Sequence, residues 1–430
     1  MRFQSLNQWL DWQMLLHVKS IDLGLERVSE VAQRLGIESI AKQVIIVAGT
    51  NGKGSTVACY ENWLSRAGFS VASYTSPHLL DYNERIKLDT EPVCDERLCQ
   101  AFEAVDQVRQ DTALTYFEFG TLAAFWLMQN HAPDYAILEV GLGGRLDAVN
   151  IIDADLVHLT SIGIDHQGWL GDSREEIGFE KAGVLRKQVA VVCNDIQPPQ
   201  SVLDEIERLD CQSLQFQRDF SIQESEQSGS YDWLGQGLEF RLTPPLPGQH
   251  QLQNLAGVVA GLSLLLPLNQ YEPQAVADYF AGTQLAGRFQ RLQTTLPAQV
   301  YVDVGHNQDA ASAIAASLSA IKSPGQRVVV LLGMLEDKAS EQYVSEFENI
   351  VDSWWLLSLD CDRGLTADQL EQRISHRVTV QQKFLSAGNA VDAALSSLSN
   401  QDIILVTGSF ATVEFFLRAL SKIDSLCNST

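Results

Sequence analysis

The sequence predicts an α/β fold built on a mostly parallel sheet, and three observations support this class. Short apolar runs typical of buried strands alternate along the chain with longer helical patterns. The apolar run 44–48 enters a glycine-rich turn at 49–55, and a helical pattern follows it. The 430 residues are 45% hydrophobic and 20% charged, a composition that can build large cores. A chain of this length predicts two or three domains.

The first half of the chain is expected to begin with helices and to continue with parallel strands. Helical patterns cover residues 6–17 and 25–35, with a loop at 20–24 between them. Strands are expected at 44–48, 70–74, 134–140, 156–160 and 189–193, and helices at 95–111 and 116–130. Because open α/β sheets bind ligands at the carboxyl ends of their strands, polar residues that follow these runs are candidates for a site.

The second half changes character before the α/β pattern returns. Residues 212–245 are polar and predict irregular hairpins, and a long apolar helix is expected at 248–266. Further strands are expected at 300–304, 328–332, 354–357 and 403–406, with a helix at the end of the chain. A linker near 282–287 suggests one domain over 1–284 and a smaller one over 285–430.

Charge and cysteine usage exclude several classes of protein. The net charge of −24 argues against a partner that is a nucleic acid or an anionic membrane. The seven cysteines include no C-x-x-C pair, which argues against a structural zinc site and fits free thiols in a reducing compartment. No apolar run is long enough to span a bilayer. We therefore expect a cytoplasmic protein, and we expect a monomer.

The turn at 49–55 has the residue types of a phosphate-binding loop. Glycines allow backbone N–H groups to converge on an anion, and the following helix adds the positive end of its dipole. Lys53 could reach outer phosphates, and Ser55 could offer a hydroxyl to Mg²⁺. The spacing departs from G-x-x-x-x-G-K-[ST], because two residues separate Gly49 from Gly52. A purely structural glycine-rich turn therefore stays open as an alternative.

Three further residues have both a functional and a structural interpretation. Glu139 ends an apolar strand and could help to hold Mg²⁺ beside the loop, whereas a lone glutamate there is more often a surface residue. His166 follows another strand; it could bind a metal, or it could be a loop histidine bonded to Asp165. Lys181 lies in a helical pattern, and its residues alone favour an exposed lysine paired with a neighbouring glutamate.

In the second half, the segments 287–290 and 303–307 stand out. A strand that ends in Asp303 and continues as Val-Gly-His-Asn is unusual for a buried strand. Arg288 could clamp a phosphate with its two parallel N–H groups, and the alternative is a solvated linker residue.

Taken in order, the motifs form a recognisable set. They are Gly-Thr-Asn-Gly-Lys-Gly-Ser at 49–55, Thr-Ser-Pro-His-Leu at 75–79, Leu-Glu-Val-Gly-Leu-Gly-Gly-Arg-Leu-Asp at 138–147, Asp-His at 165–166, Glu-Lys-Ala-Gly at 180–183, Gly-Arg-Phe-Gln at 287–290 and Gly-Ser-Phe at 408–410. The first resembles the phosphate loop of the Mur ligase superfamily. The whole set resembles the folylpolyglutamate synthase family, in particular its bacterial bifunctional members, over nearly the whole chain and most weakly over 195–245.

The resemblance implies an ATP-dependent ligase with a P-loop domain like the Mur ligase central domain and a smaller Rossmann-like C-terminal domain. It assigns ATP to Gly49, Thr50, Asn51, Gly52, Lys53, Gly54, Ser55, Asn254, Arg288 and Asp303. It assigns Mg²⁺, with two ions expected, to Ser55, Ser76, Glu139 and His166. It places His306 and Ser409 near the incoming L-glutamate. Lys181 matches a lysine that CO₂ converts to a carbamate in the family, so the resemblance implies a functional lysine where the residues alone favoured an exposed one.

The resemblance also implies an acceptor site for dihydropteroate and folates. Three segments match it: Asp22, Leu23 and Gly24; Thr115, Tyr116, Phe117 and Glu118; and Leu146, Asp147 and Ala148. Tyr116 and Phe117 offer flat apolar faces to a pterin or aminobenzoate ring. Without the family, both rings would be interpreted as core residues at the start of a helix.

The implied reaction activates a carboxylate as an acyl phosphate, which the amine of glutamate then attacks. Lys53 and Lys181, with His306 and Ser409, are the candidate catalytic residues. Four alternatives remain: a P-loop phosphotransferase, a nucleotide-binding regulator without turnover, another amino-acid ligase of the superfamily, and a polyglutamate synthase that makes no dihydrofolate.

Overall fold

A computed structural model describes residues 2–17, 19 and 21–427. The chain divides into two compact units: the first comprises Met1–Pro245 and Gln251–Gln284, and the second comprises Leu246–His250 and Leu285–Thr430. The sequence analysis placed residues 246–250 in the first domain, but this segment packs with the second unit. A side-chain carbon on Gly248 would lie 3.2 Å from the Ser317 hydroxyl, which shows how closely the segment approaches that unit.

The first unit alternates helices and strands, as expected. In chain order its elements are α1 (Leu6–Leu16), α2 (Glu26–Leu35), β1 (Gln43–Ala48), α3 (Lys53–Arg66), β2 (Val71–Tyr74), η1 (Tyr82–Arg85), β3 (Ile86–Leu88), β4 (Glu91–Pro92), α4 (Asp95–Arg109), α5 (Tyr116–His131), β5 (Tyr135–Glu139), η2 (Ala148–Ile151), β6 (Leu156–Leu159), α6 (Gln167–Leu170), α7 (Arg174–Ala182), β7 (Ala190–Cys193), α8 (Gln200–Arg208), β8 (Gln212–Gln215), β9 (Phe220–Glu224), β10 (Tyr231–Gly235), β11 (Leu238–Leu242), α9 (Gln249–Leu265), η3 (Leu268–Gln270) and α10 (Pro273–Asp278).

An eight-stranded sheet organises the described part of this unit, in the order β4-β3-β2-β5-β1-β6-β7-β8. The strands from β2 to β8 in this order run parallel, and β3 and β4 add an antiparallel edge. The α/β class with a mostly parallel sheet is therefore confirmed. The strand β8 was not expected, because it lies in the polar stretch that predicted irregular hairpins; β9, β10 and β11 of the same stretch form an antiparallel sheet.

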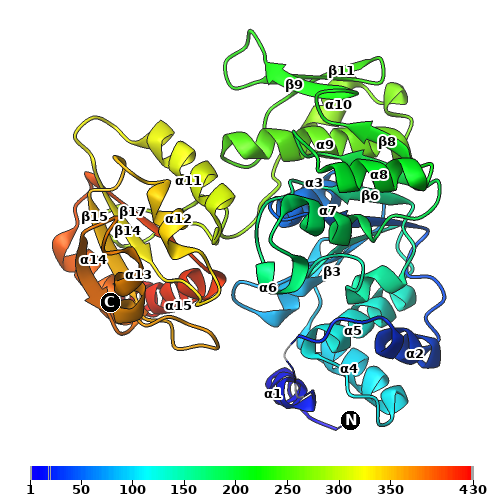
Figure 1. Ribbon diagram of the computed structural model, residues 1–430, viewed down its shortest axis with the longest axis horizontal. Coiled ribbons are helices and arrows are strands. Elements are labelled where there is room, and N and C mark those ends of the chain that lie inside the picture. Colours follow the sequence, from blue (N-terminus) through cyan, green and yellow to red (C-terminus); the bar gives the residue numbers. More distant parts are fainter. Residues whose placement is uncertain (1, 18, 20, 428–430) are drawn as a thin grey trace. The chain divides into compact units, whose positions relative to one another are not determined.

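Strand β1 shows why the central strands are apolar throughout. Val44 and Ile46 belong to a core that includes residues of α1, α2, α4, α5, α7 and α8. Ile45 and Val47, which alternate with them, belong to a second core with α3, α9, α10 and the antiparallel sheet. A strand buried on both faces needs apolar residues at every position. In Figure 1, α1, α2, α4 and α5 gather at one end of this unit, and β9, β11 and α10 lie at the opposite end.

The second unit is built on a six-stranded sheet within the described residues, in the order β12-β13-β17-β14-β15-β16. Its elements are β12 (Gln290–Leu292), β13 (Gln299–Val302), α11 (Gln308–Ile321), β14 (Arg327–Leu332), α12 (Ser340–Ser345), β15 (Ser353–Leu357), α13 (Ala367–Ile374), β16 (Val380–Phe384), α14 (Ala387–Ser397), β17 (Asp402–Thr407) and α15 (Phe410–Cys427). Only the short strand β12 is antiparallel to its neighbour. The sequence analysis did not predict β16, whose exposed Gln and Lys residues hide the apolar signal of a strand.

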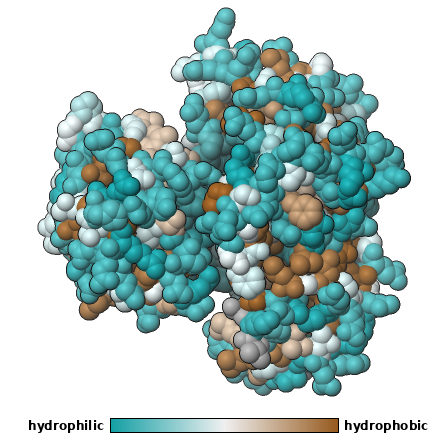
Figure 2. Space-filling view, in the orientation of Figure 1, coloured by the Kyte–Doolittle hydropathy of each residue, from teal (hydrophilic) through white to brown (hydrophobic). Residues whose placement is uncertain are grey.

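Hydrophilic side chains cover most of the visible face of each unit (Figure 2), in keeping with the net charge of −24. On the first unit, hydrophobic side chains gather near the middle of that face. None of the helices in the described ranges combines the length and the apolar character that a membrane crossing requires.

Candidate functional site

Four candidate segments of the first unit follow neighbouring parallel strands. The strand β1 pairs with β5 on one side and with β6 on the other, and β5 also pairs with β2. The carboxyl ends of these strands therefore meet at one edge of the sheet. The loop at 49–55 follows β1, Ser76 follows β2, Glu139 ends β5, and the segment to His166 follows β6. The sheet thus brings together residues that are more than 100 positions apart.

The loop at 49–55 joins β1 directly to the N-terminal end of α3. Gly52 caps this helix with a φ of 91°, a left-handed conformation that favours glycine. A side-chain carbon on Gly52 would lie 2.5 Å from the Asn254 amide oxygen, so the position also excludes larger residues for lack of space. A merely structural turn was the alternative; the residues present also fit an anion, because the first N–H groups of a helix have no acceptor within the helix and this loop leads into the start of α3.

Lys53 is the first residue of α3, and its ammonium group donates to the carbonyl of Thr50 at 3.2 Å. The lysine is therefore folded back over the loop, where a bound phosphate would meet it. Ser55 is almost completely buried in the first turn of the same helix. The N-terminus of α3 thus carries an ammonium group, a hydroxyl and a glycine-rich turn. Proteins bind nucleotide phosphates with these groups.

The segment that follows β6 is bonded to the loop through Thr50. The N–H of Thr50 donates to Ser161 O at 2.7 Å. The Thr50 hydroxyl donates to Gly163 O at 3.1 Å and accepts from Gly163 N at 3.0 Å. The loop and the segment at 161–163 therefore form one hydrogen-bonded unit.

Ile162, between these two residues, is held from the other side. Its N–H donates to Asp195 Oδ2 at 2.7 Å, and its carbonyl accepts from Arg174 Nε at 2.7 Å. The guanidinium of Arg174 also contacts both carboxylate oxygens of Asp195 at 3.0 Å. Because Arg174 begins α7, the same pair fixes the start of the helix that contains Lys181.

The residues expected to hold Mg²⁺ offer oxygen and nitrogen donors at this edge. Glu139 is buried, and its carboxylate accepts from the backbone N–H of Ser76 at 3.3 Å. His166 has a φ of 53°, and such strained backbone at a non-glycine residue concentrates at functional sites. Among the residues that the structure describes, no three His, Cys, Asp or Glu side chains converge on one metal position. Nucleotide-bound Mg²⁺ needs only one or two protein carboxylates, and Glu139 with the hydroxyls of Ser55 and Ser76 fits that chemistry.

Lys181 is not the exposed lysine that its residue pattern alone favoured. Its side chain is buried, and its nitrogen donates to the carbonyl of Gly49 at 2.8 Å. Burial lowers the pKa of the Lys181 amine to about 7, and the positive charge of Lys53 acts in the same direction. A substantial fraction of neutral amine is therefore present near neutral pH, beside the phosphate loop.

Asp147 is a buried carboxylate on the loop that follows β5. Burial raises the pKa of Asp147 to about 6, against the opposing effect of backbone N–H donors and, to a smaller extent, of the positive charge of Lys53. The carboxylate accepts from Leu142 N at 2.8 Å and from Val149 N at 3.0 Å, and it caps the short helix η2. Ala148 is buried beside it, and Leu146 is 41% exposed.

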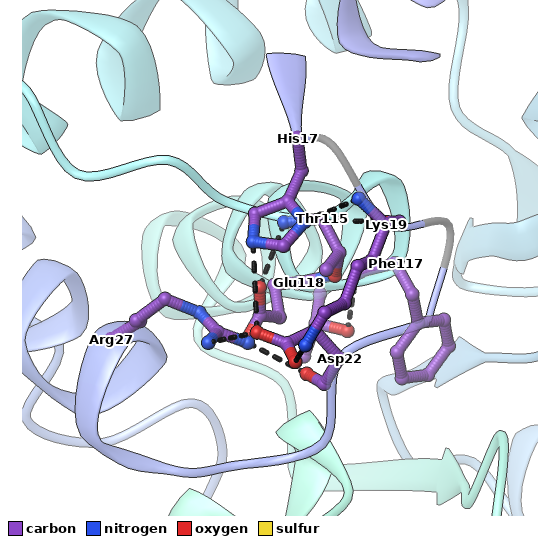
Figure 3. Close-up of polar contacts among 8 residues, drawn as sticks. His17, Lys19, Asp22, Arg27, Thr115, Phe117 and Glu118 are labelled. Atoms are coloured by element: carbon purple, nitrogen blue, oxygen red, sulfur yellow. Dashed lines mark hydrogen bonds and ion pairs between the residues drawn. The ribbon is translucent and has the colours of Figure 1, made fainter. Parts of the chain in front are cut away.

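Side chains of the first two acceptor segments are already bonded to the protein, as Figure 3 shows. Thr115 and Glu118 form a reciprocal capping box at the start of α5, with Thr115 N donating to Glu118 Oε2 at 2.8 Å. Arg27 donates to Glu118 Oε1 at 2.9 Å and to Asp22 Oδ2 at 2.5 Å. Lys19 donates to the other oxygen of Asp22 at 3.0 Å. These carboxylates therefore serve first to hold the segments in place.

The two aromatic residues of the second segment differ in their surroundings. The ring of Phe117 points away from the ion pairs (Figure 3), and a side-chain carbon on Gly141 would lie 2.6 Å from it. Gly141 follows the end of β5, so Phe117 lies at the same edge as Glu139. Tyr116 packs edge-on against Tyr82 at 5.8 Å between ring centres and lies under Arg85 at 5.5 Å. Both rings are partly buried, so neither is a fully enclosed core residue.

The second unit gathers its candidates in the same way. Strands β13 and β17 are parallel neighbours, so Asp303 and Ser409 follow adjacent strand ends. Asp303 accepts from Phe289 N and Gly305 N, each at 2.7 Å, and burial raises its pKa. Arg288 lies over the Phe410 ring at 5.6 Å, which places it on this edge of the unit. Its side chain therefore packs against an aromatic ring and does not extend into solvent, as the alternative of a linker residue required.

His306 and Ser409 are oriented by neighbouring groups. The Nδ1 of His306 lies 3.0 Å from the carbonyl of Val304, and because a carbonyl can only accept, Nδ1 is the donor in this contact. The Ser409 hydroxyl accepts from Thr412 N at 3.0 Å and lies 2.7 Å from the Thr412 hydroxyl. This hydroxyl therefore caps the first turn of α15.

Sequence reasoning missed three residues that hold these segments together. The sequence could have indicated Asp195, because it closely follows the strand that ends at Cys193, where ligand-binding residues of α/β sheets are expected. Arg174 and Arg27 had none, since their partners are remote in sequence and an arginine on a helix is ordinarily exposed.

Comparison with known proteins identifies the family. The Mur ligase middle domain matches residues 47–262, and the glutamate ligase domain of Mur ligases matches residues 287–410. Dihydrofolate synthase/folylpolyglutamate synthase of Escherichia coli is 36% identical over 416 residues, which cover 96% of this chain and 95% of the relative. The protein of the same name from Haemophilus influenzae is 38% identical over 429 residues, 96% of each chain.

Solved structures agree with this result. The E. coli FolC structure in complex with DHPP and ADP has a TM-score of 0.90 at 36% identity and covers 98% of both chains. A bifunctional folylpolyglutamate synthase/dihydrofolate synthase with Mn, AMPPNP and L-glutamate bound has a TM-score of 0.88 at 36% identity, covering 97% of this chain and 98% of that one. This chain belongs to the Mur ligase family, within its group of dihydrofolate synthases/folylpolyglutamate synthases.

Proposed function

We propose that this protein is an ATP-dependent ligase that adds L-glutamate to dihydropteroate, forming dihydrofolate, and to folates that already end in glutamate. The observation that supports this most is the glycine-rich loop at the start of α3, with Lys53 over it and Glu139 on the neighbouring strand, in a chain that matches the named relatives almost from end to end.

The reaction must activate a carboxylate, because carboxylates do not react with amines at neutral pH. The acceptor carboxylate attacks the γ-phosphate of ATP and gives an acyl phosphate and ADP; the amine of glutamate then attacks the acyl carbon and expels phosphate. Lys53 and the N–H groups at residues 49–55 hold the phosphates and offset the charge that develops during transfer. Asn254 lies against this loop, and we assign it with Arg288 and Asp303 to the nucleotide.

We assign the divalent cation to Ser55, Ser76, Glu139 and His166. Mg²⁺, when bound, supplies positive charge that neutralises the phosphate oxygens. The contribution of the chain is to keep these donors at one edge: the bonds of Thr50 to Ser161 and Gly163 fix the segment that leads to His166 against the loop.

We further propose that Lys181 reacts with CO₂ to form a carbamate: the amine nitrogen bonds to the carbon of CO₂, one C=O π bond becomes a C–O⁻ group, and the nitrogen releases a proton to solvent. Its neutral fraction near pH 7 and its burial against Gly49 O support this, because only the uncharged amine attacks CO₂. The carbamate would supply two anionic oxygens beside the cation. The check is ¹³C NMR after equilibration with labelled CO₂: a carbamate signal that disappears in Lys181→Ala is expected, and a spectrum unchanged by that substitution would contradict the assignment.

His306 and Ser409 are assigned to the incoming glutamate, and Asp22–Gly24, residues 115–118 and residues 146–148 to the acceptor.

One product assay tests the proposal against its alternatives. The protein is incubated with MgATP, glutamate and either dihydropteroate or tetrahydrofolate, and the products are identified by mass. Glutamate-dependent ADP release with both acceptors is expected. A stable phosphorylated acceptor would indicate a phosphotransferase, binding without turnover a regulator, and extension of tetrahydrofolate alone a polyglutamate synthase only.

A further inference from the structure

A single arginine joins the two segments of the acceptor site that come first in the chain. Arg27 lies in the first turn of α2, and its guanidinium makes three hydrogen bonds (Figure 3). It donates to the carboxylate of Asp22 at 2.5 Å, to the carbonyl of Asp22 at 2.6 Å, and to Glu118 Oε1 at 2.9 Å. Arg27 therefore binds both the side chain and the backbone of Asp22, and it also binds Glu118, which is 91 positions away in the sequence.

Of the two carboxylates that Arg27 binds, that of Glu118 is the more firmly held. Its carboxylate is almost fully buried, and its two oxygens have separate tasks: Oε2 accepts from Thr115 N at 2.8 Å, and Oε1 accepts from Arg27. The capping box fixes Glu118 to the start of α5, which is a long buried helix. Asp22, in contrast, lies on the connection between α1 and α2 and belongs to neither a helix nor a strand. Arg27 is therefore the group through which the rigid helix determines where the Asp22 connection lies.

The position of this connection matters because of what lies next to it. Phe117 is adjacent to Glu118 in sequence, and its ring lies against Gly141 at the end of β5. The guanidinium of Arg27 thus bonds the Asp22–Gly24 segment to Glu118, the residue next to Phe117. Among the described residues, no other hydrogen bond or ion pair links Asp22 to α5, since the remaining partners of its carboxylate, Lys19 and His17, lie on its own side of the chain.

We propose that Arg27 is a positioning residue that sets how tightly the enzyme holds dihydropteroate, the shorter of its two acceptors. The inference rests on the proposed function and deepens it. Dihydropteroate lacks the terminal glutamate of a folate and so has fewer groups with which to bind, and we expect its affinity to depend more on the segments that Arg27 joins. Without the guanidinium, the segment around Asp22 is no longer hydrogen-bonded to Arg27. Binding of dihydropteroate must then also order this segment, which weakens its affinity.

The test compares Arg27→Met with a matched control, Arg34→Met. Arg34 lies on the same helix, and its side chain is 30% exposed, against 29% for Arg27. It also ties α2 to the end of α4 through Arg109 O at 3.1 Å and to the following connection through Thr112 Oγ1 at 3.2 Å, but it forms no hydrogen bond or ion pair with Asp22 or Glu118 among the described residues. The two variants therefore remove similar amounts of packing and charge.

The measured quantities are KM and kcat for dihydropteroate and for tetrahydrofolate, and KM for ATP. Arg27→Met should raise KM for dihydropteroate about tenfold or more, and KM for tetrahydrofolate about threefold or less, with kcat and KM for ATP within about twofold of wild type. Arg34→Met should leave all these constants within about twofold. Equal effects of Arg27→Met on both acceptors, or equal effects of the two variants, would overturn the proposal.

Two further variants keep the test informative if Arg27→Met unfolds because Glu118 loses its counterion. Arg27→Lys keeps the charge but not the fork of donors, and it should give an intermediate KM for dihydropteroate. The double variant Arg27→Met/Glu118→Gln removes the stranded carboxylate, and it should restore the melting temperature but not the affinity for dihydropteroate. Recovery of both would show that Arg27 serves stability alone, which rejects the positioning role.

Direct binding of dihydropteroate, followed by calorimetry without ATP, separates this inference from the proposed function. If wild type binds dihydropteroate without turnover and Arg27→Met weakens binding, the positioning role stands and the proposed function fails. If wild type turns over and Arg27→Met behaves like Arg34→Met, the proposed function stands and the positioning role fails. A wild type that neither binds nor converts dihydropteroate rejects both.

Discussion

The phosphate loop and the acceptor segments of the first unit are built on different principles. The loop at 49–55 is defined by its backbone: Gly52 has a left-handed conformation, Lys181 bonds the carbonyl of Gly49, and Thr50 is tied to the segment after β6. The first two acceptor segments, Asp22–Gly24 and 115–118, are held by side-chain charges, with Arg27 between them. A site formed by backbone groups tolerates little change in its shape, whereas the hydrogen bonds of Arg27 to Asp22 and Glu118 can be lost one at a time. We expect substitutions in the loop to stop the reaction, and substitutions at Arg27 to change which acceptor the enzyme prefers.

The largest effect should come from Lys53→Ala, which removes the charge over the loop and leaves its backbone intact. We expect kcat to fall by about a thousandfold or more, because the variant loses stabilisation of the transferring phosphoryl group. Its melting temperature should equal that of Lys42→Ala, a control at the start of β1 whose lysine pairs with Asp134 at the surface. Ligase activity within tenfold of wild type would refute the role assigned to Lys53.

Gly52→Ala changes the backbone site without removing any charge. The new side chain would meet the Asn254 amide and would have to adopt a φ of 91°, so we expect KM for ATP to rise about a hundredfold. Gly36→Ala is the control: its φ is also positive, at 72°, but no atom lies within 4 Å. Gly36→Ala should cost about 1 to 2 kcal/mol of stability and leave KM for ATP unchanged. Similar KM values in the two variants would mean that strain alone matters.

Lys181 predicts a pH dependence of stability. Its pKa is lowered from 10.5 to about 7 in the folded state, so between these values the unfolded chain binds more protons than the folded one. The free energy of unfolding should therefore rise with pH from about 7 to about 10, which is the reverse of a lysine in an ion pair. Urea midpoints across this range should rise more in wild type than in Lys181→Met. Equal slopes for the two proteins would contradict the buried amine.

The smallest effect is expected for Phe117→Ala, within the acceptor segments. The ring lies over Gly141, and its loss should raise KM for dihydropteroate by about tenfold at most, and KM for tetrahydrofolate less. Phe119, two residues later, is completely buried, so Phe119→Ala should lower the melting temperature while the ratio of the two KM values stays constant. A KM ratio that changes equally in both variants would assign Phe117 to the core.

The fold was predictable wherever one strand or helix could be recognised from its own residues. The run at 44–48 predicted β1, because burial on both faces of a parallel sheet demands apolar residues at successive positions. Strand β16 was missed, since it lies at the sheet edge and exposes polar side chains. The segment at 246–250 groups with the second unit, and its residues alone do not indicate which of two cores they pack against.

For the site, the sequence by itself determined the chemical groups: a glycine-rich turn with Lys53 and Ser55, a carboxylate at a strand end, and motifs specific enough to indicate the family. It could not determine which groups meet. Lys181 and Gly49 are 132 positions apart, and only the order of the strands brings them within 2.8 Å. Burial then changes the chemistry, because a lysine removed from water holds its proton less strongly than the same lysine at the surface. Arg27, Glu118 and Asp22 likewise became a functional unit only through packing, since hydrogen bonds depend on distance in space and not on position in the chain.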